Sequence, residues 1–162
     1  MSKTIQLFIT CLIDTLQPQI GEAMVNVLEH VGLKVAFLEG QTCCGQPAFN
    51  AGLRPEARKM AQHTIEVFEQ VRDPIVIPSG SCTAMIRHGY LELFSDDANW
   101  LPRAQALAAR SYEFCEYLVD EMGITNVGAS WEGKIAYHPS CHLSRGLGVD
   151  RQPRALLAAL QH

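Results

Sequence analysis

The chain has 162 residues, of which 48% are apolar, and a formal net charge of −4. This size and composition predict one packed globular domain, and the absence of a basic run disfavours a nucleic-acid partner. No apolar stretch reaches the roughly 18 residues that a transmembrane helix needs. The N-terminus has no small-residue cleavage site, so we expect neither a transmembrane segment nor a signal peptide.

The first third of the chain predicts two strands separated by a helix. Residues 5–10 form a mostly buried apolar run that is typical of a strand. Residues 18–32 begin with proline, carry one apolar face at helical spacing and end with glycine, which predicts a helix. Residues 35–38 predict a second short strand that leads into two adjacent cysteines.

The middle of the chain repeats this alternation. A second helix is predicted from Pro55 until the Asp-Pro pair at residues 73–74 interrupts it. Residues 75–78 predict a third strand, and a Ser-Gly-Ser turn follows it. Residues 83–94 then have a helical pattern, and residues 95–102 are polar and typical of a loop.

The last part of the chain predicts a longer helix over residues 102–123, a fourth strand over residues 135–137 and a helical tail over residues 150–160. Strands that alternate with helices at this rhythm predict an α/β fold. We therefore expect a mostly parallel sheet of short strands with helices on both of its faces.

Five of the six cysteines follow predicted strands: Cys11 after the first, Cys43 and Cys44 after the second, Cys82 after the third and Cys141 after the fourth. The carboxyl ends of parallel strands meet at one edge of a sheet, which is where such folds bind ligands. The sixth, Cys115, falls on the apolar face of the predicted helix over residues 102–123, where a thiol packs as a small hydrophobic group.

Cysteines in a chain without an export signal predict a cytoplasmic protein whose thiols are metal ligands, redox groups or buried residues. Thiolates are the common ligands of iron–sulfur clusters, and Cys82 would lie near a helix N-terminus that favours a thiolate. Three alternatives stay open: a structural zinc site, a metal-free thiol–disulfide site, and purely structural cysteines. Met85 would share a helix face with Cys82 and fill space beside it.

The cysteine spacing resembles that of the cysteine-rich, or CCG, domain family. Its pattern is a cysteine, a gap of thirty-odd residues, Cys-Cys-Gly, a similar gap and Cys-x-x-Cys. Here 31 residues separate Cys11 from Cys43, and 37 separate Cys44 from Cys82. The chain is most similar to the lactate utilization protein A group, within a family that includes the iron–sulfur component of glycolate oxidase and a cysteine-rich component of heterodisulfide reductase.

The resemblance implies that Cys11, Cys43, Cys44 and Cys82 ligate an iron–sulfur cluster. Met85 stands where the full family pattern has its last cysteine, so a cubane [4Fe–4S] cluster and a non-cubane variant both remain open. Cys141 would be either an orphan thiol or an additional group that leans over this site. An aerobically prepared sample could lack the cluster, because oxygen destroys exposed clusters and oxidises their thiols.

In function, the resemblance implies an electron-transfer subunit, non-catalytic or co-catalytic, of a complex that oxidises L-lactate, or a related 2-hydroxy acid, to pyruvate. Its partners would be a second iron–sulfur protein and a third subunit. Two alternatives remain: a thiol–disulfide oxidoreductase of the heterodisulfide reductase type, and a metal-free redox or regulatory module.

The resemblance also implies two cysteine-rich repeats. Residues 1–130 would form the first repeat, and residues 131–162 would begin a second, truncated one that starts with Cys141. Only 21 residues follow Cys141, which is fewer than the 31 between Cys11 and Cys43, so a second Cys-Cys-Gly motif cannot follow it in this chain.

Overall fold

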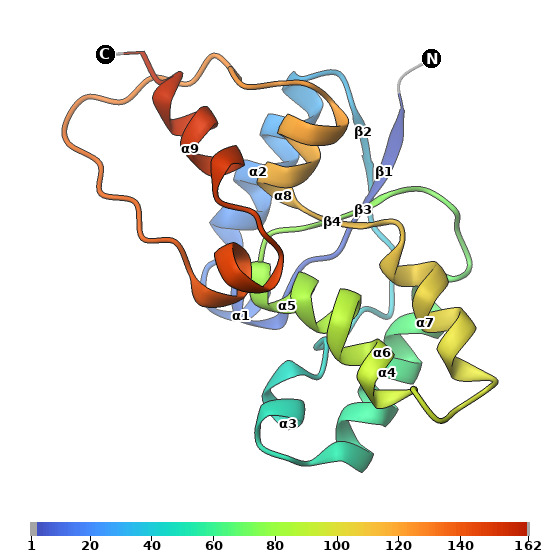
Figure 1. Cartoon of the computed structure of the whole chain (residues 1–162). Helices are drawn as coiled ribbons and strands as arrows, with labels where there is room; N and C mark the ends of the chain where they lie inside the picture. The colour runs from blue at the N-terminus through green and yellow to red at the C-terminus, as the bar shows by residue number, and fades with distance from the viewer. Residues whose placement is uncertain (1–2, 162) are drawn as a thin grey trace.

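The protein is built on a four-stranded sheet in which every strand pairs in parallel (Figure 1). The computed structural model describes residues 3–161. The strand order is β2-β1-β3-β4. The strands are β1 (Thr4–Leu7), β2 (Lys34–Ala36), β3 (Ile75–Ile77) and β4 (Ser111–Glu113). The predicted α/β fold with a mostly parallel sheet is therefore confirmed.

Alternate residues of the central strands point into two separate cores. Ile75 and Ile77 of β3 belong to one cluster of buried side chains, whereas Val76 between them belongs to the other. Phe8, which directly follows β1, packs in the first cluster, and Ile5 packs in the second. Because successive side chains of a strand point to opposite faces, the two cores lie on opposite faces of the sheet. Both faces are thus covered, as the sequence predicts.

One face is covered by α2 (Pro18–His30) and by the helical segments that follow β4. Proline at the start of α2 lacks only an N–H group that has no partner at a helix N-terminus, so it fits there. Met24 and Leu28 of α2 are buried against the sheet. A short helix that the sequence did not predict, α1 (Cys11–Leu16), connects β1 to α2 and buries none of its residues.

The other face is covered by helices from the middle of the chain: α3 (Gln46–Asn50), α4 (Arg54–Phe68), α5 (Gly80–Ala84), α6 (Tyr90–Leu93) and α7 (Trp100–Ala108). A π-helical turn, η1 (Met85–Gly89), joins α5 to α6. This continuous run agrees with the predicted helix over residues 83–94. Figure 1 shows α1 and α5 beginning at the end of the sheet where β1 and β3 finish, whereas α3 lies farther from the sheet and packs against α4 and η1.

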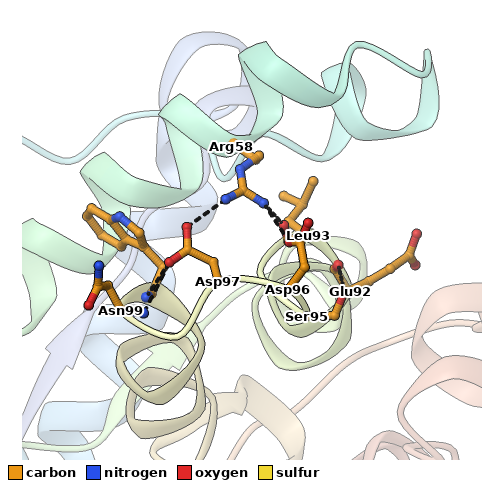
Figure 2. Close-up of polar contacts among 8 residues, drawn as sticks. Arg58, Glu92, Leu93, Ser95, Asp96, Asp97 and Asn99 are labelled. Atoms are coloured by element: carbon orange, nitrogen blue, oxygen red, sulfur yellow. Dashed lines mark hydrogen bonds and ion pairs between the residues drawn. The ribbon is translucent and has the colours of Figure 1, made fainter.

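Arg58 of α4 fixes the loop between α6 and α7 (Figure 2). Its guanidinium donates to the backbone carbonyl of Leu93 and, at 2.7 Å, to the carboxylate of Asp97. The other oxygen of Asp97 accepts the backbone N–H groups of Asn99 and Trp100, each at 3.1 Å. These bonds satisfy donors at the start of α7, which explains why the helix begins before Pro102.

The single helix predicted over residues 102–123 is wrong. After α7 the chain forms β4, then α8 (Phe114–Glu116) and the π-helical turn η2 (Tyr117–Glu121). The buried residues Ser111 and Glu113 lie on β4, which pairs with β3. A strand of three residues is too short to interrupt an apolar pattern at helical spacing, so only its pairing with β3 reveals it.

The strand predicted over residues 135–137 is also wrong. Within the part of the chain that the structure describes, residues 131–141 contain no strand, and one isolated bridge joins Ser130 to Gln161. Figure 1 shows this segment as a long loop that passes around α9 (Arg151–Ala158). An apolar run forms a strand only beside a partner strand, and this segment has none. The predicted helical tail over residues 150–160 is confirmed by α9.

Candidate functional site

Four cysteines meet at the carboxyl ends of β1, β2 and β3. Cys11 is the first residue of α1, Cys43 and Cys44 lie in the loop before α3, and Cys82 lies in the first turn of α5. The thiol of Cys44 donates to the sulfur of Cys82 at 3.2 Å, and both side chains are buried. Cys11 lies near enough to Cys43 and Cys82 for both thiols to raise its pKa.

The pKa values of the two thiols of the buried pair are shifted in opposite directions. A hydrogen bond to Cys82, followed by burial, raises the pKa of Cys44 far above its ordinary value. The same bond from Cys44 lowers the pKa of Cys82 to about 7, against the effect of burial and with help from the hydroxyls of Ser79 and Ser81. Near neutral pH, Cys44 is therefore the proton donor and Cys82 the incipient thiolate. A thiolate is the form that attacks disulfides and binds metals.

Cys11 and Cys43 form the second pair, nearer to solvent. Both side chains are partly exposed. Burial, and then the hydrogen bond with Cys43, raises the pKa of Cys11 to about 11. Cys11 therefore keeps its proton at neutral pH until a cation displaces it.

The remaining cysteines lie outside this group. Cys141 is exposed and precedes the π-helical turn η3 (His142–Gly146), so it does not follow a strand as predicted. Because η3 packs on α5, the thiol is carried on the same side of the molecule as Cys82. Cys115 lies in α8, directly after β4, rather than in the middle of a long helix. It is partly buried, and burial raises its pKa to about 12.

Side chains outside the cysteine group hold the loops that carry it. The buried hydroxyl of Tyr90 donates to the carbonyl of Cys44 at 2.9 Å. The hydroxyl of Ser79 caps α5 by accepting the backbone N–H of Cys82. The side-chain amide of Gln41 bonds to the backbone of Leu7 and of Ile9, just before Cys11. The sequence reasoning missed these three polar supports because they are defined only by contacts between distant segments.

Gly45 of the Cys-Cys-Gly motif is required by its backbone and by its neighbours. Its φ of +84° is in the left-handed region that favours glycine. A Cβ atom at this position would lie 3.2 Å from the Cβ of Met60 and 3.4 Å from the carbonyl oxygen of Ala57. The motif glycine therefore lets the cysteine loop turn tightly against α4.

Met85 fills space beside the thiols, as predicted. It is buried in the same cluster as Cys44 and Cys82. A Cβ atom on Gly89 would lie 2.4 Å from the Met85 sulfur, so the absence of a side chain at Gly89 makes room for the thioether. Between α3, η1 and η3 lies a cavity of about 220 Å³, lined by Ser81, Met85, His88 and His142 among others. The sequence did not predict this cavity.

The donor set fits a soft metal. Four thiols converge from three loops, and sulfur is the ligand type of iron–sulfur clusters. Over residues 3–161, however, no three or more His, Cys, Asp or Glu side chains form a group that could hold a metal ion. The structure thus shows the thiols in two pairs. Their chemistry is that of metal ligands, but they are not arranged as a coordination shell.

The parallel sheet with a cysteine-rich carboxyl edge defines the class of protein. The pattern of the cysteine-rich domain family, CCG, matches residues 5–87. The chain belongs to this family.

Individual relatives are similar over nearly the whole chain. Lactate utilization protein A of Exiguobacterium sp. (strain ATCC BAA-1283 / AT1b) is 50% identical over 154 residues, which are 94% of this chain and 62% of the relative. The protein of the same name from Bacillus pumilus (strain SAFR-032) is 47% identical over 154 residues, 95% of this chain and 64% of the relative. The chain therefore spans a little less than two thirds of the length of these relatives.

Proposed function

We propose that the chain is an iron–sulfur subunit that transfers electrons in lactate utilization, with Cys11, Cys43, Cys44 and Cys82 as cluster ligands. The observation that carries this proposal is the convergence of four thiols at one sheet edge, two of them with sulfurs 3.2 Å apart. Support also comes from the family and from the relatives, which are named for lactate utilization. A bound cluster would supply one-electron chemistry at a potential set by its surroundings.

The chain's own residues prepare this site. Cys82 contributes the thiol with the lowered pKa, so it gives up its proton most readily to an incoming cation. Burial of Cys44 and Cys82 against Met85 excludes water from one side of the site. The burial of the ligands and the exclusion of water both influence the reduction potential of a cluster. The partly exposed Cys11 and Cys43 leave the other side open, which is where an electron partner could approach.

The proposed setting is a cytoplasmic complex that oxidises L-lactate or a related 2-hydroxy acid to pyruvate, with a second iron–sulfur protein and a third subunit as partners. The reducing cytoplasm would keep the thiols free for iron. Over the described residues, no helix is long and apolar enough to cross a membrane.

Anaerobic reconstitution with ferrous iron and sulfide tests the cluster. We expect the wild-type protein to bind iron and acid-labile sulfide in equal amounts and to show a cluster signal by electron paramagnetic resonance after reduction. The Cys43→Ser variant should lose this cluster. Cys115→Ser is the matched control, because it also removes a partly buried thiol but lies in α8, and it should retain the cluster. A wild-type protein that binds no iron under these conditions would refute the proposal.

A metal-free thiol–disulfide oxidoreductase is the second candidate. It is favoured by the buried contact between Cys44 and Cys82 and by the pKa of Cys82, lowered to about 7 by its hydrogen bond from Cys44. This function requires that the iron-free protein reduces a small disulfide and that Cys82→Ser abolishes the turnover. Iron-free wild-type protein that forms no mixed disulfide with glutathione disulfide would exclude it.

A further inference from the structure

The side chain of Gln41 continues the sheet beyond the end of β2. Its Nε2 donates to the carbonyl of Leu7 at 2.8 Å, and its Oε1 accepts the backbone N–H of Ile9 at 3.2 Å. In a parallel ladder, one residue bonds in this way to the residues before and after its partner. The primary amide of Gln41 thus takes the place of a strand residue opposite Phe8, although β2 itself ends at Ala36.

This contact joins the two loops that carry the outer thiol pair. Ile9 lies two residues before Cys11, and Gln41 lies two residues before Cys43. Among the described residues, the segment from 38 to 44 contains a turn at residues 39–40 but makes no backbone–backbone hydrogen bond to another part of the chain, so side chains hold it in place. Besides Gln41, the backbone of this segment is held by His63, whose Nε2 is 2.7 Å from the Gly40 carbonyl oxygen, and by Tyr90 at Cys44. Of these three side chains, Gln41 is the one that connects the segment to the strand leading to Cys11.

We propose that Gln41 is a positioning residue that sets the separation of Cys11 and Cys43 and thereby the shape of the thiol site. Gln41 is not itself a ligand, since its amide is engaged by the backbone of β1 and of the residues after it. For the cluster this inference rests on the proposed function, but the positioning of the two thiols does not. Loss of the amide would free the loop and let Cys43 move relative to Cys11.

Two preparations of the full chain test this role, one reduced and iron-free and the other reconstituted. In the reduced, iron-free protein, the yield of a Cys11–Cys43 bridge formed by the short bifunctional thiol reagent dibromobimane reports the distance between the two thiols. In the reconstituted protein, the rate of iron loss to a chelator and the electron paramagnetic resonance line shape report whether the metal ligands keep their arrangement. The variants are Gln41→Ala and Gln41→Met, which keeps the length of the side chain but removes both hydrogen bonds. Gln70→Ala, at an exposed glutamine just after α4, is the matched control.

We expect both Gln41 variants to lower the bridging yield and to speed iron loss about 10-fold or more, as is typical when groups that orient metal ligands are removed. Their circular dichroism should match the wild type, and the Gln70→Ala control should match it in every measurement. If Gln41→Ala fails to fold, Gln41→Met decides. Unchanged bridging in a folded Gln41 variant would overturn the proposal. If the wild-type protein takes up no iron, the proposed cluster is refuted, while the bridging yield still decides the role of Gln41.

Discussion

At the scale of single residues, Glu113 is the buried carboxyl group with the clearest consequence for stability. Its side chain caps α8 by accepting the backbone N–H groups of Cys115 and Glu116, at 2.8 and 3.1 Å. Desolvation nonetheless raises the pKa of Glu113 to about 7 from an ordinary value of 4.5. The folded protein therefore binds this proton more tightly than the unfolded chain does.

This shift predicts that stability falls as pH rises from about 4.5 to about 7. Between these values the folded state holds one more proton than the unfolded state, so the free energy of unfolding decreases with pH. The loss from this group is on the order of 3 kcal/mol, from the difference between a pKa of 4.5 and one of about 7. Urea unfolding at several pH values measures it. Glu113→Gln should flatten this part of the profile, and Glu22→Gln, at an exposed position of α2, should leave it unchanged. An unaltered profile for Glu113→Gln would contradict the prediction.

At the scale of secondary-structure elements, the contact between α5 and η3 depends on a glycine. A Cβ atom on Gly80 would lie 2.7 Å from the Cβ and 3.0 Å from the Cα of Leu143. The Cα atom belongs to the backbone, so η3 as a whole would have to move. This contact attaches the segment that follows Cys141 to the helix that carries Cys82.

We predict that Gly80→Ala destabilises the protein by about 1–3 kcal/mol, as expected for overpacking. Gly146→Ala is the control within the same contact, because its Cβ atom would lie 3.9 Å from the Cβ of Ala84, an ordinary contact distance. It should be neutral or slightly stabilising, since alanine favours helical backbone. Chemical unfolding of both variants gives the two values. Equal effects would show that the approach of Leu143 to Gly80 is not close enough to matter.

At the scale of the whole molecule, residues 131–141 differ from the rest of the chain. Regular backbone pairing beside them is confined to the bridge between Ser130 and Gln161 in the part that the structure describes. Trp131 and Ile135 expose about half of their surface, 55% and 48%. Together with Tyr137 and with Leu157 from α9, they line a cavity of about 500 Å³. Residues 123–129, which precede this segment, are also irregular and mostly exposed, whereas η3 and α9 follow it.

We predict that the amides of residues 132–138 exchange with solvent much faster than those of β3, because their hydrogens are not held in a ladder. Hydrogen exchange followed by mass spectrometry measures both in one experiment, and α9 provides a second internal reference with intermediate protection. Protection of residues 132–138 equal to that of β3 would contradict the prediction.

The assignment of residues 1–130 and 131–162 to two repeats stays a prediction. Protection of residues 135–137 in a fusion with the remaining third of a longer relative would support it.

The sequence alone determined the class of fold and the cysteines of the candidate site. Two kinds of signal predicted the parallel α/β sheet: buried apolar runs at strand spacing and helices bounded by proline and glycine. The position of the cysteines after predicted strands placed Cys11, Cys43, Cys44 and Cys82 at one edge of that sheet. These signals are local, because they depend on residues within one strand, helix or turn. The CCG family pattern is also readable, because it is a spacing of residues along the chain and does not depend on which of them are in contact.

Only the tertiary structure decided which short apolar segments become strands and how the thiols are arranged. Ser111–Glu113 pairs with β3 and became β4, whereas residues 135–137 have no neighbouring strand and stay irregular. The pairing of Cys44 with Cys82 and the double hydrogen bond of Gln41 join residues more than thirty positions apart. Such contacts form only when the whole sheet brings its loops to one edge, so no local pattern in the sequence specifies them.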